Sequence, residues 1–318
     1  MSFRLATFNA ENFDLAPEAE GRFARRLAAL RPLLARLDAD VLCLQEIAAP
    51  RPRPGAPRGF EPLDRLLADT PYAARHRATS MRPGSGRPAD VHNLAVVSRY
   101  PIAEIRHIHH DFVPEWTLDP PLADADEPVR AQFDRPLLYV RLATDDGPLH
   151  VLNLHLRAPR AAFLPGEKAH GAWTSSAGWA KGMFLAAQLR QAQALEARLL
   201  VEDIFDADTE ARIAVCGDFN ADSYETPTRI LCATPDDLAD GAFADRQLAR
   251  LEARVAADRR HTVIHAGRRV LLDHILASPA LAGACHRVDI LNEDLLDEAT
   301  TLDEVDGSLH APIVATFV

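Results

Sequence analysis

Residues 212–222 read RIAVCGDFNAD, an apolar run that ends abruptly in a carboxylate and a carboxamide two positions apart. The short β-branched and small residues of this run predict a buried strand. Side chains at positions i and i+2 of an extended segment point to the same side. We therefore expect Asp218 and Asn220 to stand together at the end of a strand, where they could hold a polar ligand.

The same pattern, an apolar run with polar residues at one end, recurs along the chain in FRLATFN, DVLCLQE, LHVLNLHL, VLLDHILA and the segment before IVATFV. The polar residues are Asn9, Gln45 with Glu46, Asn153 with His155, Asp273 with His274, and His310. Ligand sites in sheets gather at the ends of strands. The sequence therefore predicts a cleft lined by carboxylates, amides and imidazoles.

Helical patterns lie between the strand-like runs. Residues 20–38 carry apolar side chains at three- and four-residue steps, and residues 181–203 show the same period. Strands mixed with helices, and a hairpin-like pair around residues 144–150, predict a mixed sheet rather than a parallel one. No repeat and no Gly/Ser linker divides the 318 residues. We expect one domain that spans residues 1–318.

The formal net charge of −11 disfavours tight, sequence-independent binding to duplex nucleic acid. A local basic region remains, because residues 51–88 hold eight arginines against three acids. Such charge runs are usually solvated loop surface. The alternative is that this segment meets a phosphate-bearing substrate, so nucleic acid and nucleotides stay among the expected partners.

The cysteines are widely scattered, without the spacing of a metal site. Two of them, Cys43 and Cys216, lie inside apolar runs, which predicts buried free thiols in a reducing compartment. The N-terminal residues enter a strand-like run with no signal-peptide pattern. No apolar run approaches the length that spans a bilayer. We expect a cytoplasmic protein without a membrane span.

The residue types at the strand ends indicate a metal-assisted reaction. Glu46 and Asp218 offer hard oxygen ligands, and the Cys and multiple-His spacing that zinc prefers is missing, so Mg²⁺ (or Mn²⁺) is the expected ion. A carboxylate-held metal beside two histidines suits cleavage of a phosphate ester. An aspartate bonded to a histidine fixes its tautomer, which would place Asp273 behind His310.

The ordered set of motifs resembles the endonuclease/exonuclease/phosphatase superfamily, whose fold DNase I, abasic-site endonucleases, sphingomyelinases and inositol-polyphosphate 5-phosphatases share. The matching stretches are TFNAENF, LCLQEI, HNLAVVSRYPI, VLNLHLRAP, VCGDFNAD, LDHILAS and SLHAPIVATF, in the family's order between residues 7 and 317. Each is weak alone, and together they are specific. The resemblance implies an α/β (α+β) fold, a four-layered sandwich of two packed mixed sheets flanked by helices.

The resemblance also implies how the metal is held. Glu46 matches the principal metal ligand, and Asn9 the first-strand asparagine that organises the metal and the water-holding carboxylate. The family commonly has Ser-Asp-His before its last strand, whereas this chain has Ser308, Leu309 and His310. Leucine cannot bind a metal, and Asp306 is three residues away. One metal centred on Glu46 is therefore expected rather than two.

Five further residues match the positions that act on the phosphate. By resemblance, His155 contacts the scissile phosphate and Asp218 orients or deprotonates the attacking water. Asn220 would bind a phosphate oxygen. His310 would stabilise the transition state, with Asp273 as its partner.

Three functions follow. The first is a divalent-metal-dependent phosphoesterase that hydrolyses a phosphodiester, in nucleic acid, a nucleotide or a small molecule, by in-line attack of an activated water. The second is a phosphatase acting on a small phosphomonoester or a phospholipid head group. The third is a non-catalytic protein that binds a phosphate ligand with the same fold, because Leu309 replaces the usual aspartate.

Several other residues have two interpretations, as part of the site or as ordinary structural polar groups. They are Glu11, Asn12, Asn93, Asn153 and Arg135. The cluster HIHHD at residues 107–111 suggests a metal site, but nothing elsewhere completes a zinc set. We expect exposed strand and loop there.

Overall fold

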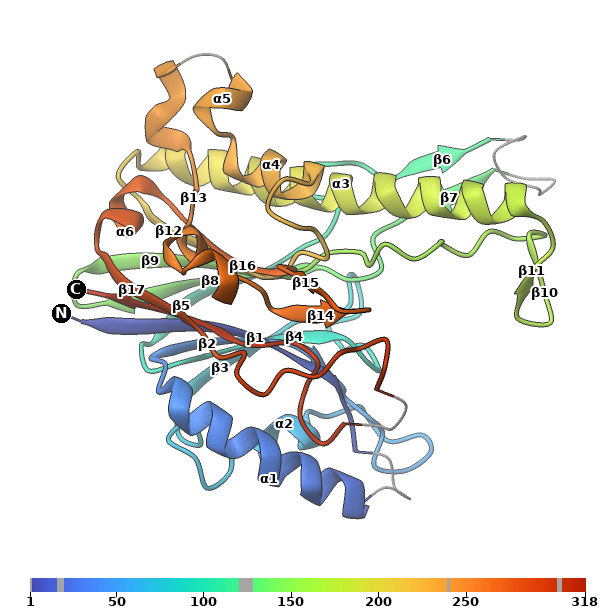
Figure 1. Ribbon diagram of the computed structural model, residues 1–318, viewed down its shortest axis with the longest axis horizontal. Helices are drawn as coiled ribbons and strands as arrows, with labels where there is room; N and C mark the ends of the chain where they lie inside the picture. The colour runs from blue at the N-terminus through green and yellow to red at the C-terminus, as the bar shows by residue number, and fades with distance from the viewer. Residues whose placement is uncertain (1, 16–19, 120–127, 239–240, 302–304) are drawn as a thin grey trace.

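Two six-stranded mixed sheets face each other in the computed structural model, which describes residues 2–15, 20–119, 128–238, 241–301 and 305–318 (Figure 1). The first sheet contains, in spatial order, β17 (Cys285–Ile290), β18 (Ile313–Phe317), β1 (Phe3–Phe13), β2 (Val41–Ile47), β4 (Asn93–Ser98) and β3 (His76–Thr79). The second contains β13 (Ala249–Arg250), β16 (Asp273–Ala277), β12 (Arg212–Asp218), β9 (Gly147–His155), β8 (Leu137–Thr144) and β5 (Ile102–Ile108). β1 pairs parallel with β2, and β9 parallel with β12, while the other pairs are antiparallel.

Helices cover both outer faces. α1 (Glu20–Leu37) and α2 (Glu61–Leu67) pack on the first sheet, and α3 (Ser176–Ala207) and α4 (Thr226–Cys232) on the second (Figure 1). One apolar cluster lies between the two sheets, and one lies between each sheet and its helices. Each fully buried leucine of these clusters stabilises the fold by about 2 kcal/mol. The four-layered sandwich, the DNase I-like fold expected from the sequence, is confirmed.

Both helical predictions hold. The apolar stripe of α1 is buried at Phe23, Leu27, Leu30, Leu34 and Leu37. The second helix, α3, begins earlier than residue 181, because Ser175 caps its first turn by accepting a hydrogen bond from the Gly178 N–H. It also ends later than residue 203, at Ala207. No helix in the described ranges combines the length and apolar character that crossing a bilayer requires.

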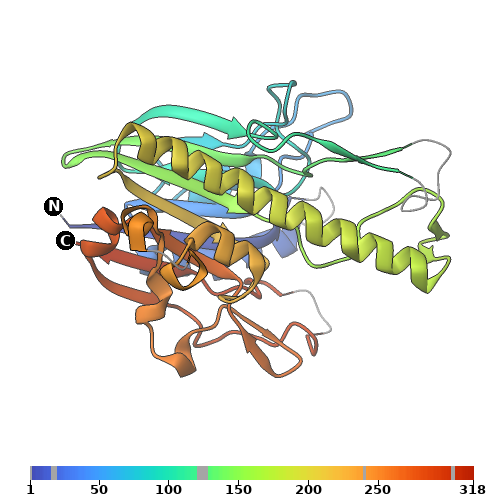
Figure 2. The same ribbon diagram turned by 90° about the horizontal axis from the view of Figure 1, so that it is seen from above.

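An arm extends beyond the sheets (Figures 1 and 2). It consists of the N-terminal half of α3 with β6 (Trp116–Leu118), β7 (Val129–Ala131), β10 (Lys168–Ala169) and β11 (Ala172–Trp173). The arm has an apolar cluster of its own, to which Leu118, Phe133, Leu164, Leu185 and Leu189 belong. The shorter elements of the body are α5 (Pro235–Leu238), η1 (Gly241–Arg246), η2 (Leu251–Arg254), η3 (Ala257–Arg259), β14 (Val263–His265), β15 (Arg268–Val270) and α6 (Pro279–Gly283).

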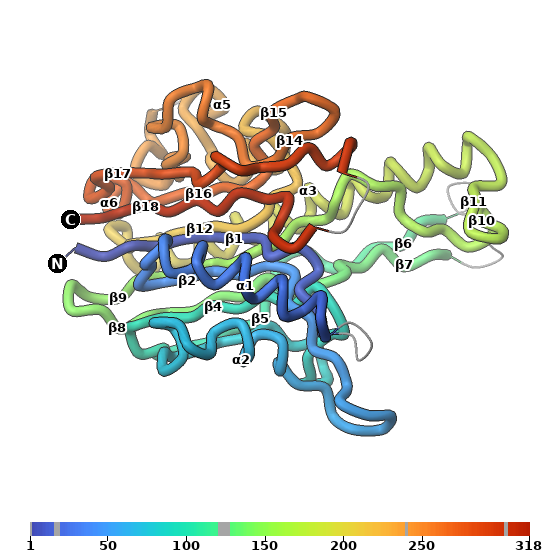
Figure 3. Tube along the Cα trace, turned by 60° about the horizontal axis from the view of Figure 1, so that its bottom comes forward, coloured from blue at the N-terminus to red at the C-terminus, as the bar shows by residue number. Residues whose placement is uncertain are grey.

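The strand ends that the sequence singled out meet at one end of the sandwich. In the second sheet Asp218 lies opposite His155 on one side and opposite Asp273 on the other. Asn9, where the pairing of β1 with β2 becomes irregular, donates a hydrogen bond to Asp218 across the two sheets, with 3.0 Å between Nδ2 and Oδ2. β1 itself continues to Phe13 rather than ending at Asn9 as the sequence predicted. β1 begins and β18 ends at the opposite end (Figure 3). The predicted cleft therefore draws on both sheets.

Gln45 and Asn153 join the two sheets below this end. The Gln45 amide donates to Asn153 Oδ1 at 2.7 Å, and the Asn153 amide donates to the carbonyl oxygens of Leu44 and Ala95, each at 3.0 Å. Both side chains are fully buried. Asn153 therefore braces the sandwich rather than lining the site, which decides between its two interpretations.

Gly217 is required where β12 approaches β9. Its φ is +137°, and a Cβ there would lie 1.9 Å from the Leu154 carbonyl oxygen. We expect Gly217→Ala to lower the free energy of unfolding by about 3 kcal/mol, through backbone strain and overpacking. Urea unfolding measures the change. Gly283→Ala in α6 is the matched control, since no atom lies within 4 Å of its added Cβ. Equal midpoints for the two variants would contradict the prediction.

Candidate active site

The seven residues predicted to act in the site form one hydrogen-bonded and electrostatic cluster at the shared strand ends. They are Asn9, Glu46, His155, Asp218, Asn220, Asp273 and His310. Their chemical roles stay predictions, and the geometry below states what each one contacts.

Asn9 connects two carboxylates from different sheets. Its Nδ2 donates to Glu46 Oε1 and to Asp218 Oδ2, each at 3.0 Å, and its Oδ1 accepts from the Glu11 backbone N–H at 2.9 Å. The side chain is fully buried. Since all its polar atoms have partners, Asn9 fixes the distance between Glu46 and Asp218.

Glu46 is held as a carboxylate. Burial alone would raise its pKa, but hydrogen bonds from the Asn9 amide and the Asn12 backbone N–H, with the nearby His92 and His310, place the pKa below its usual range. The Asn12 N–H reaches Oε2 at 2.8 Å. The Glu46 side chain keeps 14% of its surface exposed, so an ion from solvent can reach it.

The backbone around the site is strained. The left-handed conformation, with φ between +43° and +61°, occurs at Glu11, Asn12, Glu46, His92 and Asn220. This region is uncommon for residues other than glycine and costs about 1–3 kcal/mol each. Such strain clusters where a chain must aim several side chains at one point, as at active sites.

Asp218 receives hydrogen bonds on both oxygens. Oδ1 accepts from the Asn220 backbone N–H at 2.8 Å, and Oδ2 accepts from the amides of Asn9 and, at 3.3 Å, of Asn220. Burial, together with the charges of Asp273 and Glu46, raises the pKa of Asp218 to about 7, although His310 opposes the rise. A carboxylate with such a pKa is suited to accept a proton near neutral pH.

The expected strand spacing of Asp218 and Asn220 is wrong. β12 ends at Asp218, and Asn220 lies in the following bend with φ +47°. The turn, rather than an extended backbone, folds the Asn220 amide onto the carboxylate. Its Nδ2 also donates to the Leu156 carbonyl oxygen at 3.1 Å. In this geometry Asn220 braces Asp218, and its contact with a phosphate oxygen stays a prediction.

Arg135 sets the tautomer of His155. Its Nη1 lies 2.6 Å from His155 Nδ1, and because a guanidinium only donates, Nδ1 must accept. Burial lowers the pKa of His155 well below its usual value, and the positive Arg135 lowers it further, so the ring is neutral. The proton therefore sits on Nε2, which faces Asp218 Oδ2 at 3.5 Å and Glu46 Oε1 at 3.8 Å. Arg135 also forms an ion pair with Asp134. Both interpretations of Arg135 therefore hold, because it contacts a site histidine and takes part in an ion pair.

His310 and Asp273 form the predicted pair. His310 Nδ1 lies 2.8 Å from Asp273 Oδ2, and His310 Nε2 has no hydrogen-bond partner among the described residues. Burial opposes a charge on the ring, but Asp273, with Asp218 and Glu46, raises the pKa of His310 to about 10. His310 is therefore an imidazolium at neutral pH, with one N–H left to donate.

The loop before His310 is tied to β1. Ser308 Oγ donates to the Asn9 carbonyl oxygen at 2.8 Å, and the Leu309 N–H donates to Glu11 Oε2 at 2.6 Å. Glu11 thus supports the loop from beside the site. Asp306 pairs with the exposed Arg25 instead of entering the site, which agrees with the prediction that it does not replace the missing aspartate.

Sequence reasoning missed two residues that support the site. Arg26 on α1 is buried and donates to the carbonyl oxygens of Ala10, Asn12 and Gly307 at 2.6–3.1 Å, which joins the end of β1 to the His310 loop. The signal was its position on the apolar stripe of α1. His92 lies within the HNLAVVS motif, and its ring centroid is 6.1 Å from that of His155.

Other candidates lie outside the site or brace it. Asn93 donates to the carbonyl oxygens of Ile47 and Ala89 and so holds the segment before β4. In the cluster at residues 107–111, three histidines bond to backbone carbonyls, those of Thr79, Phe133 and Val113. These residues form no metal cluster within the described ranges.

The comparison with known families agrees with this geometry. The sequence model of the Endonuclease/Exonuclease/phosphatase family matches residues 6–295. The chain belongs to this family. No curated protein matches the chain in sequence.

Several solved structures share the fold across almost the whole chain. The 3′ phosphatase NExo from Neisseria, bound to a product DNA hairpin, is 18% identical, with 99% of each chain covered and a TM-score of 0.51. Truncated TDP2 from Caenorhabditis elegans is 15% identical, with 99% of this chain and 97% of that chain covered and a TM-score of 0.58. The mannosyl-6-phosphatase Bt3783 from Bacteroides thetaiotaomicron is 15% identical, with 99% of each chain covered and a TM-score of 0.58.

The residues of this endonuclease/exonuclease/phosphatase chain fit a divalent cation. Carboxylate oxygens of Glu46 and Asp218 lie within 4.8 Å of one another, as do those of Asp218 and Asp273, whereas the rings of His155 and His310 keep their Nε2 protons. Carboxylate oxygens are the ligands that Mg²⁺ and Mn²⁺ prefer. Asp273 Oδ1 is buried without a hydrogen-bond partner. Three carboxyl groups surround one imidazolium, so a cation would balance the remaining negative charge.

Proposed function

We propose that this protein is a divalent-metal-dependent phosphoesterase that hydrolyses a phosphodiester by in-line attack of an activated water. The observation that carries the proposal is the Asn9 bridge. The Asn9 amide donates one hydrogen bond to the ionised Glu46 and one to Asp218, each at 3.0 Å. The bridge sets an ion-binding carboxylate beside a carboxylate whose pKa of about 7 suits a general base.

Asp218 acts on the water. Its Oδ2 accepts the proton of the attacking water, while Asn9 and the backbone N–H of Asn220 keep the carboxylate in one orientation. Because the oxygens are fixed by three donors, the base needs no reorientation as the water attacks. This is the catalytic role that we assign to Asp218.

Two imidazoles act on the phosphate. His155 presents a neutral Nε2–H, and His310 presents a cationic Nε2–H, so both can donate to phosphoryl oxygens as negative charge develops. A Mg²⁺ or Mn²⁺ ion held by Glu46 would supply further neutralisation of that charge. Asp273 keeps His310 charged and correctly turned, which makes it a positioning residue.

A phosphatase acting on a small phosphomonoester or a lipid head group is the second candidate function. A family member of similar fold is named a mannosyl-6-phosphatase and another a 3′ phosphatase. Phosphomonoesters and phosphodiesters need the same water, base and oxyanion donors. Binding of a phosphate ligand without turnover is the third candidate, and an assay with added metal separates it from both others.

The test of the proposal is turnover with and without metal. Wild-type protein is assayed with Mg²⁺, Mn²⁺ or EDTA against bis(p-nitrophenyl) phosphate, p-nitrophenyl phosphate, plasmid and single-stranded DNA. We expect diester cleavage that EDTA abolishes. Glu46→Gln is expected to raise the metal concentration that gives half-maximal activity about 10–100-fold. The control is Glu210→Gln, an exposed glutamate just before the far end of β12. Metal-independent turnover, or none on any substrate, would reject the proposal.

A further inference from the structure

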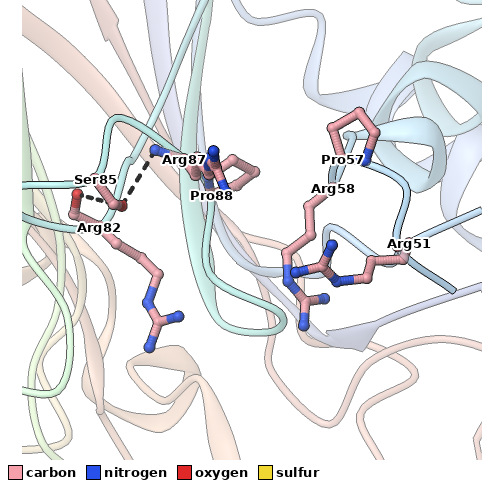
Figure 4. A pocket seen from close by; sticks show the side chains of 8 residues that line it. Arg51, Pro57, Arg58, Arg82, Ser85, Arg87 and Pro88 are labelled. Atoms are coloured by element: carbon pink, nitrogen blue, oxygen red, sulfur yellow. Dashed lines mark hydrogen bonds between the residues drawn. The ribbon is translucent and has the colours of Figure 1, made fainter.

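A basic hollow of about 440 Å³ lies on the surface between two loops. One loop follows β2 and contributes Arg51 and Arg58, and the other joins β3 to β4 and contributes Arg82 and Arg87 (Figure 4). Gly55, Pro57, Ser85 and Pro88 complete the lining, which contains no acidic residue. The arginines that line the hollow all belong to the arginine-rich segment of residues 51–88. We name this hollow the arginine pocket.

A tight turn places Arg82 and Arg87 side by side. The Arg82 N–H donates to the Arg87 carbonyl oxygen at 2.8 Å, and Ser85 Oγ donates to the Arg82 carbonyl oxygen at 3.1 Å (Figure 4). Gly84 and Gly86 have φ of +66° and +60°, a conformation that glycine adopts without strain. The sequence of this turn thus holds the backbone of Arg82 close to that of Arg87, so both cationic side chains start from the same loop beside the pocket.

The charges of the arginine pocket are poorly balanced by the protein. Arg58 pairs with Asp90, and Arg51 donates to the Ala56 carbonyl oxygen. Arg82 and Arg87 are exposed, and their guanidinium groups have no hydrogen bond or ion pair among the described residues. Many surface arginines of this acidic chain do have acidic partners, among them Arg25, Arg36, Arg65, Arg77 and Arg99. Three of the four guanidinium groups of the arginine pocket have no acidic partner among the described residues, which suits an external anion, and arginine forks match phosphate geometry.

The arginine pocket adjoins a second hollow that reaches residues beside the candidate active site. This hollow of about 840 Å³ shares Arg58, Arg82 and Ser85 with it and is lined further along by His92 and Arg135. Arg135 contacts His155 at 2.6 Å, and the ring of His92 lies 6.1 Å from that of His155. The two hollows therefore form one groove from the arginine pocket to His92 and Arg135, the residues beside His155, and Asp90, Glu115 and Asp134 also line its second part.

We propose that the arginine pocket is a second phosphate subsite, which binds a phosphate of the substrate other than the one that is hydrolysed. The proposal rests on the phosphoesterase function above and specifies its substrate class as a single-stranded oligonucleotide. A chain with phosphates repeated along its backbone can occupy both ends of the groove, whereas an ester with one phosphate cannot. The net charge of −11 disfavours a long duplex, whose phosphates would extend over the acidic surface.

The test compares substrates with one and with many phosphates. Arg82→Ser/Arg87→Ser is assayed with bis(p-nitrophenyl) phosphate and with single-stranded oligonucleotides of increasing length. We expect KM of the wild-type protein to fall with length, and the double variant to raise KM for the longest oligonucleotide at least tenfold more than for the one-phosphate ester. The slope of log affinity against log salt should become shallower by about 0.7 per lost phosphate contact. The control is Arg287→Ser, which replaces an exposed arginine on β17 and should leave KM for both substrates unchanged.

Binding separates a failure of this proposal from a failure of the phosphoesterase function. Fluorescence anisotropy with a labelled oligonucleotide needs no turnover, so it tests the arginine pocket even if the protein hydrolyses nothing. Equal affinity of wild type and double variant for the oligonucleotide would overturn the subsite. Inorganic tripolyphosphate and a duplex of the same length are the competitors. If only tripolyphosphate binding depends on Arg82 and Arg87, or if duplex competes better than single strand, the assigned substrate class is wrong.

Discussion

Asp218→Asn is expected to lower kcat by about 10³-fold, within the range that a positioned general base contributes. The change is isosteric and removes the one atom, Oδ2, that we assign to accept the proton of the attacking water. An amide oxygen is a far weaker base than a carboxylate whose pKa is about 7. Substrate binding should change little, so KM is expected to move by much less than kcat.

The surroundings of Asp218 also resist an amide. The Asn9 amide, the Asn220 amide and the Asn220 backbone N–H all donate to the carboxylate. An asparagine at position 218 would turn its own N–H₂ toward at least one of these donors, because it has only one acceptor oxygen. The site therefore loses both the base and the arrangement that holds it.

Single-turnover rates at saturating metal measure this effect, and urea unfolding checks that the variant is folded. The control is Asp208→Asn, the same change at the C-terminus of α3, beyond the far end of β12. Isothermal titration with Mn²⁺ shows whether metal binding survives. A variant that is folded, binds metal and keeps its wild-type rate would remove Asp218 from the mechanism.

The sequence predicted the cluster because the position of a residue at the end of a strand also determines which edge of the sheet it occupies. Once the chain forms parallel pairs β1–β2 and β9–β12, the residues that close these strands must lie at one end of each sheet. His155 and Asp218 are direct neighbours for this reason, and Asp273 joins them because it begins β16, which is antiparallel to β12. The pattern itself indicated only a mixed sheet with helices; the family resemblance implied two packed sheets, and that fold is confirmed.

Tertiary contacts supplied what the sequence could not. Arg26 comes from a helix whose pattern indicated only an amphipathic stripe, yet its guanidinium donates to the carbonyl oxygen of Gly307, 281 residues further along the chain. The left-handed backbone at Glu46 and Asn220 depends on the contacts of their side chains, which local propensity does not encode. Asn153 has the same residue type and burial as Asn9, yet its amide joins the two sheets through backbone carbonyls instead of reaching a site carboxylate.

Asp273→Asn is expected to lower kcat at pH 8 by about 10²–10³-fold, although Asp273 is predicted to touch neither water nor phosphate. Burial lowers the pKa of His310, and the charge of Asp273 reverses this effect and raises it to about 10. Without that carboxylate the ring loses its proton as the pH rises through the neutral range. The imidazolium form persists only below the lowered pKa, while Asp218, with a pKa of about 7, must stay ionised to act as the base. The pH range of activity should therefore narrow from its alkaline side.

The measurement is the pH dependence of kcat for wild type and variant over the range in which both stay folded. In the wild type, the decrease of kcat at high pH that His310 causes should lie near the raised pKa of His310, about 10. In Asp273→Asn this decrease should occur at lower pH. His310→Gln removes the titrating group, so it should lose activity without showing such a decrease. Because the two residues act as a unit, Asp273→Asn should add little in the His310→Gln background. Independent, multiplicative losses would show that the 2.8 Å hydrogen bond between them does not support catalysis.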